Sequence, residues 1–157
     1  MVRRKARTEN GLSPQSPRIA IADKEGQIRR CFDVIRELRP HIATVEEFLE
    51  RVQRQQQQGY RLASLEVDDQ IRAVAGYRYL EMLFHGRVLY VDDLVAREVD
   101  RSVGYGGELF DWLVGQAREH ECHSFELDSG VQRFDAHRFY LLKRMKIASH
   151  HFSLQLR

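Results

Sequence analysis

The segment of the sequence with the clearest chemical potential is a glycine-rich turn that directly follows an apolar run. Leu94-Val95-Ala96 predicts the end of a strand and Gly104-Tyr105-Gly106-Gly107 predicts the start of a helix, with Arg101 between them. The first N–H groups of a helix have no internal partners, and the helix dipole attracts anions there. Glycines let a phosphate approach the backbone, and the Arg101 guanidinium adds a charged fork. The segment therefore predicts a site for a pyrophosphate group.

Two common phosphate-binding motifs do not fit this turn. A P-loop ends in Gly-Lys-Ser/Thr, whereas this sequence has Gly106-Gly107-Glu108. The dinucleotide fingerprint needs a third glycine three residues after the second, where Leu109 stands, and it needs a βαβ unit. An ordinary flexible turn is the alternative that the glycines alone leave open.

Hydrophobic periodicity indicates which elements position the turn. Apolar residues at helical spacing predict a helix over 28–38, and Thr44 with Glu47 forms a capping box that predicts a helix from 45 to the Gln run at 55–58. Two more helices are predicted over 104–119 and 133–144.

Alternating apolar residues predict the strands. Three neighbouring runs, over 62–67, 71–83 and 87–95, predict an antiparallel meander. Further strands are predicted over 18–22, 124–127 and 147–156. The order β-α-α-β-β-β-α-β-α-β implies an α/β (α+β) fold with a mixed sheet and helices on both faces.

Two motifs in this order carry a resemblance to a known family. Arg101-Ser102-Val103-Gly104-Tyr105-Gly106 fits the pattern Arg/Gln-x-x-Gly-x-Gly/Ala, and Ala136-His137-Arg138-Phe139-Tyr140 lies on the last predicted helix. From residue 18 to 157 the sequence resembles the GNAT superfamily of acetyl-CoA-dependent N-acetyltransferases. The resemblance implies a mostly antiparallel sheet of about seven strands flanked by about four helices. One departure is Arg144-Met145, which stands where the family often has a Gly-Phe pair.

The resemblance also implies a donor, acetyl-CoA, and a set of residues that bind it. The pantetheine arm is expected to pair with the backbone of Leu94, Val95 and Ala96 like an added strand. The pyrophosphate is expected on the backbone of the turn, which comprises Arg101, Ser102, Val103, Gly104, Tyr105, Gly106 and Gly107. Tyr140 is the expected general acid, because a phenol hydroxyl can protonate the leaving thiolate.

The general base is less clearly indicated. An acceptor amine has a pKa near ~10, so only about one molecule in a thousand is neutral at pH 7. Asp92 and Asp93 precede the pantetheine segment, and strand alternation predicts that they point to opposite faces, so that at most one faces the acceptor. Glu81 and Tyr79 are weaker candidates, and capping or solvation is the alternative role of the aspartates.

Composition and charge limit the domain organisation and the classes of partner that the sequence allows. The net charge of +2 is uneven, because residues 1–18 hold five basic residues and one acidic residue. Residues 1–17 are therefore expected to be a flexible basic arm and residues 18–157 a single domain that binds no nucleic acid. No apolar run reaches the ~18 residues of a membrane helix, and no apolar segment follows the basic N-terminus, so no membrane partner or secretory signal is expected.

Cysteine and histidine usage predicts a cytoplasmic protein without a metal. Cys31 and Cys122 are too few for a disulfide framework and are expected to be reduced thiols, Cys31 in the core. His120, Cys122 and His123 match no common zinc spacing.

The leading functional hypothesis is an N-acetyltransferase that moves an acetyl group from acetyl-CoA to a primary amine by direct attack in a ternary complex. The alternative is a CoA-binding sensor or interaction module without turnover, and a third is a nucleic-acid-associated protein that uses its basic arm. Acidic residues near the expected cleft favour a cationic acceptor, and the segment 44–60 is expected to cover it. The resemblance also implies a homodimer, often formed through C-terminal strands.

Overall fold

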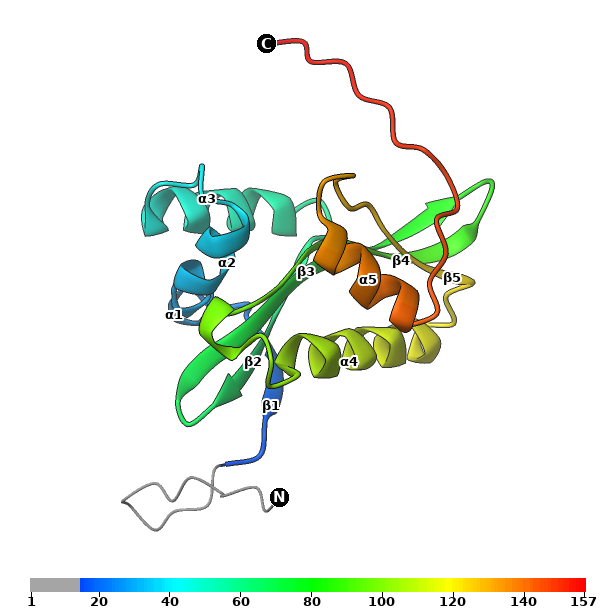
Figure 1. The fold of residues 1–157 in the computed structure, drawn as a ribbon. Helices are drawn as coiled ribbons and strands as arrows, with labels where there is room; N and C mark the ends of the chain where they lie inside the picture. Colours follow the sequence, from blue (N-terminus) through cyan, green and yellow to red (C-terminus); the bar gives the residue numbers. More distant parts are fainter. Residues whose placement is uncertain (1–14) are drawn as a thin grey trace, which may run out of the picture.

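A five-stranded sheet carries helices on both faces (Figure 1). The computed structural model describes residues 15–157, so nearly all of the predicted arm at 1–17 lies outside the described residues. In chain order the elements are β1 (Arg18–Ile21), α1 (Glu25–Arg30), α2 (Phe32–Leu38), α3 (Val45–Gln56), β2 (Arg61–Val67), β3 (Gln70–Met82), β4 (Gly86–Ala96), the 3₁₀ helix η1 (Glu98–Asp100), α4 (Tyr105–Glu119), β5 (Ser124–Leu127) and α5 (Phe134–Leu142).

The strands lie in the order β1-β2-β3-β4-β5. The first three pairings are antiparallel, which confirms the predicted meander, and only β4 and β5 are parallel. The turn between β2 and β3 is Asp68-Asp69, and both aspartates have positive φ angles, of 51° and 57°. Such angles suit the tight turns that connect antiparallel strands, and aspartate tolerates them better than most residues.

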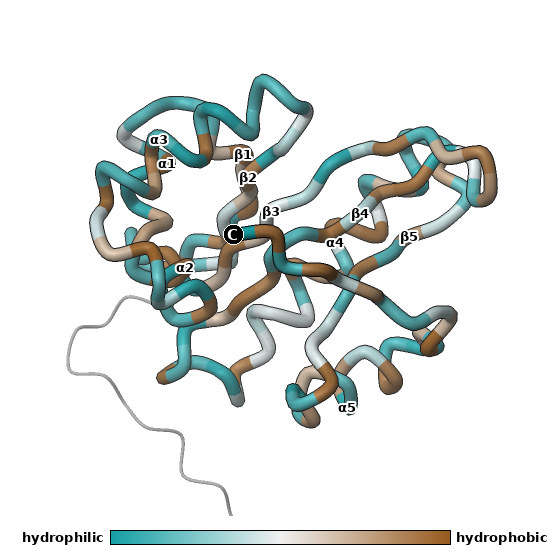
Figure 2. Tube along the Cα trace, turned by 90° about the horizontal axis from the view of Figure 1, so that it is seen from above, coloured by the Kyte–Doolittle hydropathy of each residue, from teal (hydrophilic) through white to brown (hydrophobic). Residues whose placement is uncertain are grey.

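Each face of the sheet has its own hydrophobic core. On one face α1, α2 and α3 bury Ile28, Ile35 and Phe48 against Leu62 and Val74. On the other face α4 packs on the sheet, with the core residues Leu65, Ala75, Tyr77, Leu89, Leu109 and Leu113. Figure 2 shows the α1–α3 group and α5 on opposite sides of the strands. Helices on both faces of a mixed sheet are therefore confirmed.

The helix predicted over 28–38 is two helices in the structure. α1 ends at Arg30, the Cys31 N–H donates to the Ile28 carbonyl at 3.0 Å, and α2 starts at Phe32. The break lets both short helices bury their apolar sides in one core, where Cys31 is fully buried. The predicted start of the next helix is confirmed, because the Thr44 hydroxyl accepts from the Glu47 N–H at 3.2 Å.

The final strand predicted over 147–156 is wrong. Residues 145–157 form no helix or strand, and they extend away from the end of α5 (Figure 1). Phe152, Leu154 and Leu156 are each more than 80% exposed. The apolar alternation is present, but a strand forms only beside a partner, and no strand within residues 15–157 pairs with this segment. The sheet therefore has five strands and not the expected seven.

Among the described residues, no helix is long and apolar enough to cross a membrane.

Candidate functional site

The site begins where the two parallel strands separate. The pairing of β4 with β5 ends at Val91 and Leu127, whereas β4 continues to Ala96 paired with β3 alone. Beyond Val91, one backbone edge of β4 therefore has no strand beside it within residues 15–157. Leu94, Val95 and Ala96 lie on this open edge, where an extended chain could add main-chain hydrogen bonds.

The glycine-rich turn lies at the end of that edge. α4 starts at Tyr105, and Gly104 precedes it with a φ of +103°, a left-handed conformation that costs other residues free energy. A Cβ on Gly106 would lie 3.4 Å from the Cβ of Ala96, so the helix start lies directly against the end of β4. The first N–H groups of a 15-residue helix are thus close to the open edge.

The loop between β4 and α4 is held by one buried carboxylate. Asp100 is 9% exposed and accepts from Arg97 Nε at 2.7 Å and from an Arg72 guanidinium nitrogen at 3.3 Å. Its hydrogen bond from Arg97 lowers the pKa of Asp100. The Arg101 side chain is 61% exposed, and its ion pair with Glu98 is long, at 4.0 Å. Arg101 is therefore available to an anionic ligand.

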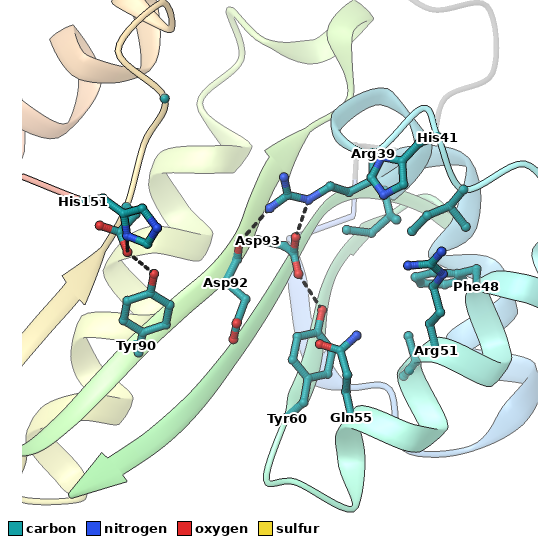
Figure 3. A pocket seen from close by; sticks show the side chains of 15 residues that line it. Arg39, His41, Phe48, Arg51, Gln55, Tyr60, Tyr90, Asp92, Asp93 and His151 are labelled. Atoms are coloured by element: carbon teal, nitrogen blue, oxygen red, sulfur yellow. Dashed lines mark hydrogen bonds and ion pairs between the residues drawn. The ribbon is translucent and has the colours of Figure 1, made fainter. Parts of the chain in front are cut away.

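A cavity of about 540 Å³ lies on the α1–α3 side of the sheet, at the point where β4 and β5 separate (Figure 3). Helices α2 and α3 and the loop between them contribute one wall, and the middle of β4 and residues that follow β5 contribute the other. The charged and polar groups on these walls include Arg39, His41, Arg51, Tyr90, Asp92, Asp93 and Asp128. The segment 44–60 lines the cavity through Phe48, Arg51, Val52, Gln55 and Tyr60.

Asp92 and Asp93 both line this cavity, so the expectation that they face opposite sides of the sheet is wrong. The reason is a β-bulge. Gly76 pairs with Asp93 and Tyr77 with Val91, which leaves Asp92 as an extra residue in β4. A bulge of this kind interrupts the alternation of side chains along a strand.

Asp93 is the more enclosed of the two aspartates, with 14% of its side chain exposed. It accepts from Arg39 Nε at 2.8 Å and from the Tyr60 hydroxyl at 2.9 Å. A Cβ on Gly76 would lie 1.8 Å from the Tyr60 hydroxyl oxygen, so the ring of Tyr60 occupies the space beside this glycine. Burial and the charge of Asp93 raise the pKa of Tyr60. Asp93 of β4 is thus linked to the residue that caps α2 and to the residue that precedes β2.

Asp92 is more accessible, with 26% of its side chain exposed. It accepts from Arg78 Nε at 2.9 Å, and Arg78 also donates to the Gln55 side chain at 3.2 Å. Burial raises the pKa of Asp92 above its ordinary value, and this effect outweighs the hydrogen bond from Arg78, which lowers it. A raised pKa makes this carboxylate a stronger base than an exposed aspartate.

Tyr140 lies on α5, and its ring is packed against aromatic neighbours. Its centroid is 5.4 Å from that of Phe139 and 6.4 Å from that of Phe110. Burial raises the pKa of Tyr140, which keeps the phenol protonated. Tyr140 is not among the residues that line the cavity. The structure therefore brings Asp92 and Asp93 together but places Tyr140 on the α4–α5 side.

The other base candidates lie away from the cavity. The Tyr79 hydroxyl contacts His120 Nδ1 at 3.0 Å, and neither Tyr79 nor Glu81 lines the cavity. Sequence reasoning missed Arg39, Tyr60 and Tyr90 as site residues. Their contacts join positions 33 to 54 residues apart, and no local motif indicates them.

Comparison with known proteins identifies the relatives of this chain. Residues 28–145 match the model of the Acetyltransferase (GNAT) family. The chain is 36% identical over 110 residues to an uncharacterized N-acetyltransferase of Bacillus subtilis (strain 168), YhdJ, and the match covers 69% of this chain and 77% of that protein.

Solved structures share the fold at low sequence identity. Glucosamine-6-phosphate N-acetyltransferase from Arabidopsis thaliana has a TM-score of 0.73 and 18% identity, covering 91% of this chain and all of that chain. The aminoglycoside N-acetyltransferase AAC(6')-Iy, in complex with the bisubstrate analog CoA-S-monomethyl-acetylneamine, has a TM-score of 0.75 and 10% identity, covering 91% of this chain and 99% of that chain.

Proposed function

The chain belongs to the GNAT acetyltransferase family and is an acyltransferase, and from this premise we propose that it moves the acetyl group of acetyl-CoA to a primary amine by direct attack in a ternary complex. One observation carries the proposal. The open edge of β4 connects the glycine-rich start of α4 to a polar cavity on the opposite side of the sheet. A donor and an acceptor can therefore enter from two sides and meet where the strands separate, and bringing two reactants together supplies much of a rate enhancement.

We propose that acetyl-CoA extends along this edge. Its pantetheine arm pairs with the backbone of Leu94, Val95 and Ala96, and its pyrophosphate binds N–H groups of the turn from Arg101 to Gly107. Three features support this placement: the unpaired edge, the helix start beside Ala96 and the exposed guanidinium of Arg101. That AAC(6')-Iy, a structural neighbour, was solved with CoA supports the choice of donor.

In the proposed reaction, the amine nitrogen attacks the carbonyl carbon of the thioester, and the C–S bond breaks. The ammonium form of the acceptor first loses one proton to solvent. The attacking nitrogen then gives a second proton to Asp92, which releases it to solvent, and the sulfur takes a proton from Tyr140, which regains it from solvent. Asp92 is preferred to Asp93 because it is more exposed and its pKa is raised. Asp93, held by Arg39 and Tyr60, fixes the bulge that directs Asp92 into the cavity.

A CoA-binding module without turnover is the second candidate. The location of Tyr140 outside the cavity is the observation that favours it, because a module needs no acid at the thioester. The raised pKa of Asp92 favours the enzyme, since shifted pKa values are typical of groups that transfer protons in catalysis.

We also propose that the protein forms a homodimer in the cytoplasm. The outer edge of β5 has no strand beside it within residues 15–157, and the segment 145–157 exposes Phe152, Leu154 and Leu156. Unpaired edges and exposed apolar segments favour association with another chain. Cys31 and Cys122 are free cysteines, as in a reducing compartment.

Turnover of a panel of amines tests the proposed function. The protein is mixed with acetyl-CoA and an alkyl diamine, an amino acid or a lysine peptide, and thiol release is followed together with the mass of the acceptor. The proposal expects CoA release with a gain of one acetyl group on at least one amine. Binding of acetyl-CoA without release on any amine would favour the module instead.

A further inference from the structure

The charges that line the cavity are matched in pairs, with one exception. Arg39 pairs with Asp93 at 2.8 Å, and Arg78 pairs with Asp92 at 2.9 Å. Arg51, on the α3 wall, pairs with Glu47 at 2.8 Å. Each of these guanidinium groups thus has a carboxylate that balances its charge. Asp128 is the cavity carboxylate that has no arginine or lysine within 4.0 Å among residues 15–157.

Asp128 lies directly beyond the last pair of the parallel strands, Val91 and Leu127. It therefore marks the point where β4 and β5 separate, across the gap from Asp92. Its carboxylate accepts a hydrogen bond from the Tyr90 hydroxyl, which comes from the neighbouring strand. The side chain is 48% exposed, so a ligand in the cavity can reach the carboxylate.

The other side chains of the cavity that can carry a positive charge are histidines. His151 Nδ1 lies 3.6 Å from Asp128, and a histidine carries a positive charge only when it is protonated. His41, on the opposite wall, is likewise charged only when it is protonated. Among residues 15–157, no arginine or lysine therefore lies within 4.0 Å of the Asp128 carboxylate to balance its charge permanently.

We infer that Asp128 binds an ammonium group of the acceptor, and that Tyr90 positions the carboxylate for this contact. The inference rests on the proposed function and narrows its acceptor class to amines with a net positive charge, such as alkyl diamines. A charge-assisted hydrogen bond to a fixed carboxylate holds a cation strongly in a cavity that already balances its other charges. An amino acid is a poorer ligand, because its own carboxylate would face Asp92, Asp93 and Asp128.

Binding of butane-1,4-diamine to the CoA-loaded protein tests this inference without turnover. Calorimetry is run on the wild type, on Asp128→Asn and on the control Asp33→Asn, an exposed aspartate of α2 outside the cavity. We expect Asp128→Asn to weaken diamine binding about tenfold or more and Asp33→Asn to leave it unchanged. Tyr90→Phe keeps the charge, so it should weaken binding by a smaller factor.

Two further measurements distinguish a failure of the Asp128 inference from a failure of the proposed function. The affinity for CoA and the unfolding temperature should be the same in Asp128→Asn and wild type, which would exclude a general loss of structure. Equal diamine affinity in wild type and Asp128→Asn, or no diamine binding by the wild type, would overturn the role of Asp128 while leaving acetyl transfer intact. Failure to bind CoA would instead contradict the proposed function.

Discussion

At the scale of single residues, Asp92 and Asp93 show how adjacent identical side chains acquire different surroundings. Both carboxylates enter one cavity because of the bulge in β4. Asp93 is held by two hydrogen-bond donors from other elements, whereas Asp92 has one arginine partner and a raised pKa. These environments support the proposal that Asp93 has a structural role and Asp92 a chemical one.

Isosteric substitutions should separate these two roles. Asp93→Asn removes the charge that pairs with Arg39, so it should lower the free energy of unfolding by about 1–3 kcal/mol. Asp92→Asn should lower kcat more and stability less. The wild-type kcat/KM should rise with pH as Asp92 loses its proton, at a pH above the ordinary aspartate pKa, and this acid limb should vanish in Asp92→Asn. Denaturant melts and pH–rate profiles check both. The ionisation of the amine near ~10 should remain in both proteins, whereas persistence in Asp92→Asn of the step just above the ordinary aspartate pKa would reassign the base.

Tyr140→Phe tests the proposed acid. The phenylalanine keeps the aromatic packing against Phe139 and Phe110 but removes the proton that the sulfur needs. We expect kcat to fall by about 10²-fold or more, within the range for general acids, with acetyl-CoA affinity unchanged. Steady-state kinetics and calorimetry measure the two quantities. Phe139→Leu is the matched control for packing, and an unchanged kcat in Tyr140→Phe would remove Tyr140 from the mechanism.

At the scale of elements, the site depends on how β4 meets its neighbours. β4 leaves β5 after Val91 and keeps β3, and the bulge lies at this point. Gly76 of β3 faces Asp93 across the bulge and leaves room for the ring of Tyr60. A glycine inside a strand is unfavourable in general, so its presence here indicates a close approach that a side chain would block.

Gly76→Ala should disturb this junction. The new Cβ would overlap the buried Tyr60 ring, so we expect a loss of about 1–3 kcal/mol in the free energy of unfolding. Gly115→Ala is the control, because it lies in α4 with no atom within 4 Å of the added Cβ and should stabilise the protein by about 0.5–1 kcal/mol. Chemical denaturation measures both variants. Equal stability of Gly76→Ala and wild type would show that Tyr60 moves freely.

Most helices and strands could be predicted from the sequence because caps, turns and hydrophobic periodicity depend on residues that are close together in the chain. The Thr44 cap, the meander turn at Asp68-Asp69 and the glycine-rich start of α4 each involve neighbours in sequence. Arg144 stands where the family often has glycine, and it adopts the left-handed conformation that favours glycine, with a φ of +65°. The bulge at Asp92 depends on register with another strand, and no alternation within β4 indicates it.

At the scale of the whole molecule, the C-terminal segment shows the limit of such patterns. Residues 147–156 alternate as a strand should, yet the pairing partner decides whether a strand forms. The cavity likewise depends on contacts between distant parts of the chain, because Arg39, Tyr60 and Asp128 reach it from three separate segments. Their convergence follows from the order of the strands and the packing of α2 and α3.

The proposed dimer makes a prediction about alternating positions of this segment. If 145–157 adds to the sheet of a second copy, one face of the new strand is buried and the other is exposed. Leu154→Glu should therefore give a monomer and Ser153→Glu should not. Light scattering coupled to gel filtration should give twice 18.5 kDa for the wild type and for Ser153→Glu. A wild-type mass of one chain would contradict the dimer.

We propose that the open edge of β4 and the start of α4 together bind acetyl-CoA, and calorimetric titration of the protein with acetyl-CoA is the decisive experiment. Gly104→Val places a β-branched residue at a φ of +103°, which the start of α4 cannot keep without strain. We expect saturable binding of one acetyl-CoA per chain to the wild type and at least about tenfold weaker binding to Gly104→Val. No binding to the wild type, or equal affinity in a folded Gly104→Val variant, would contradict it.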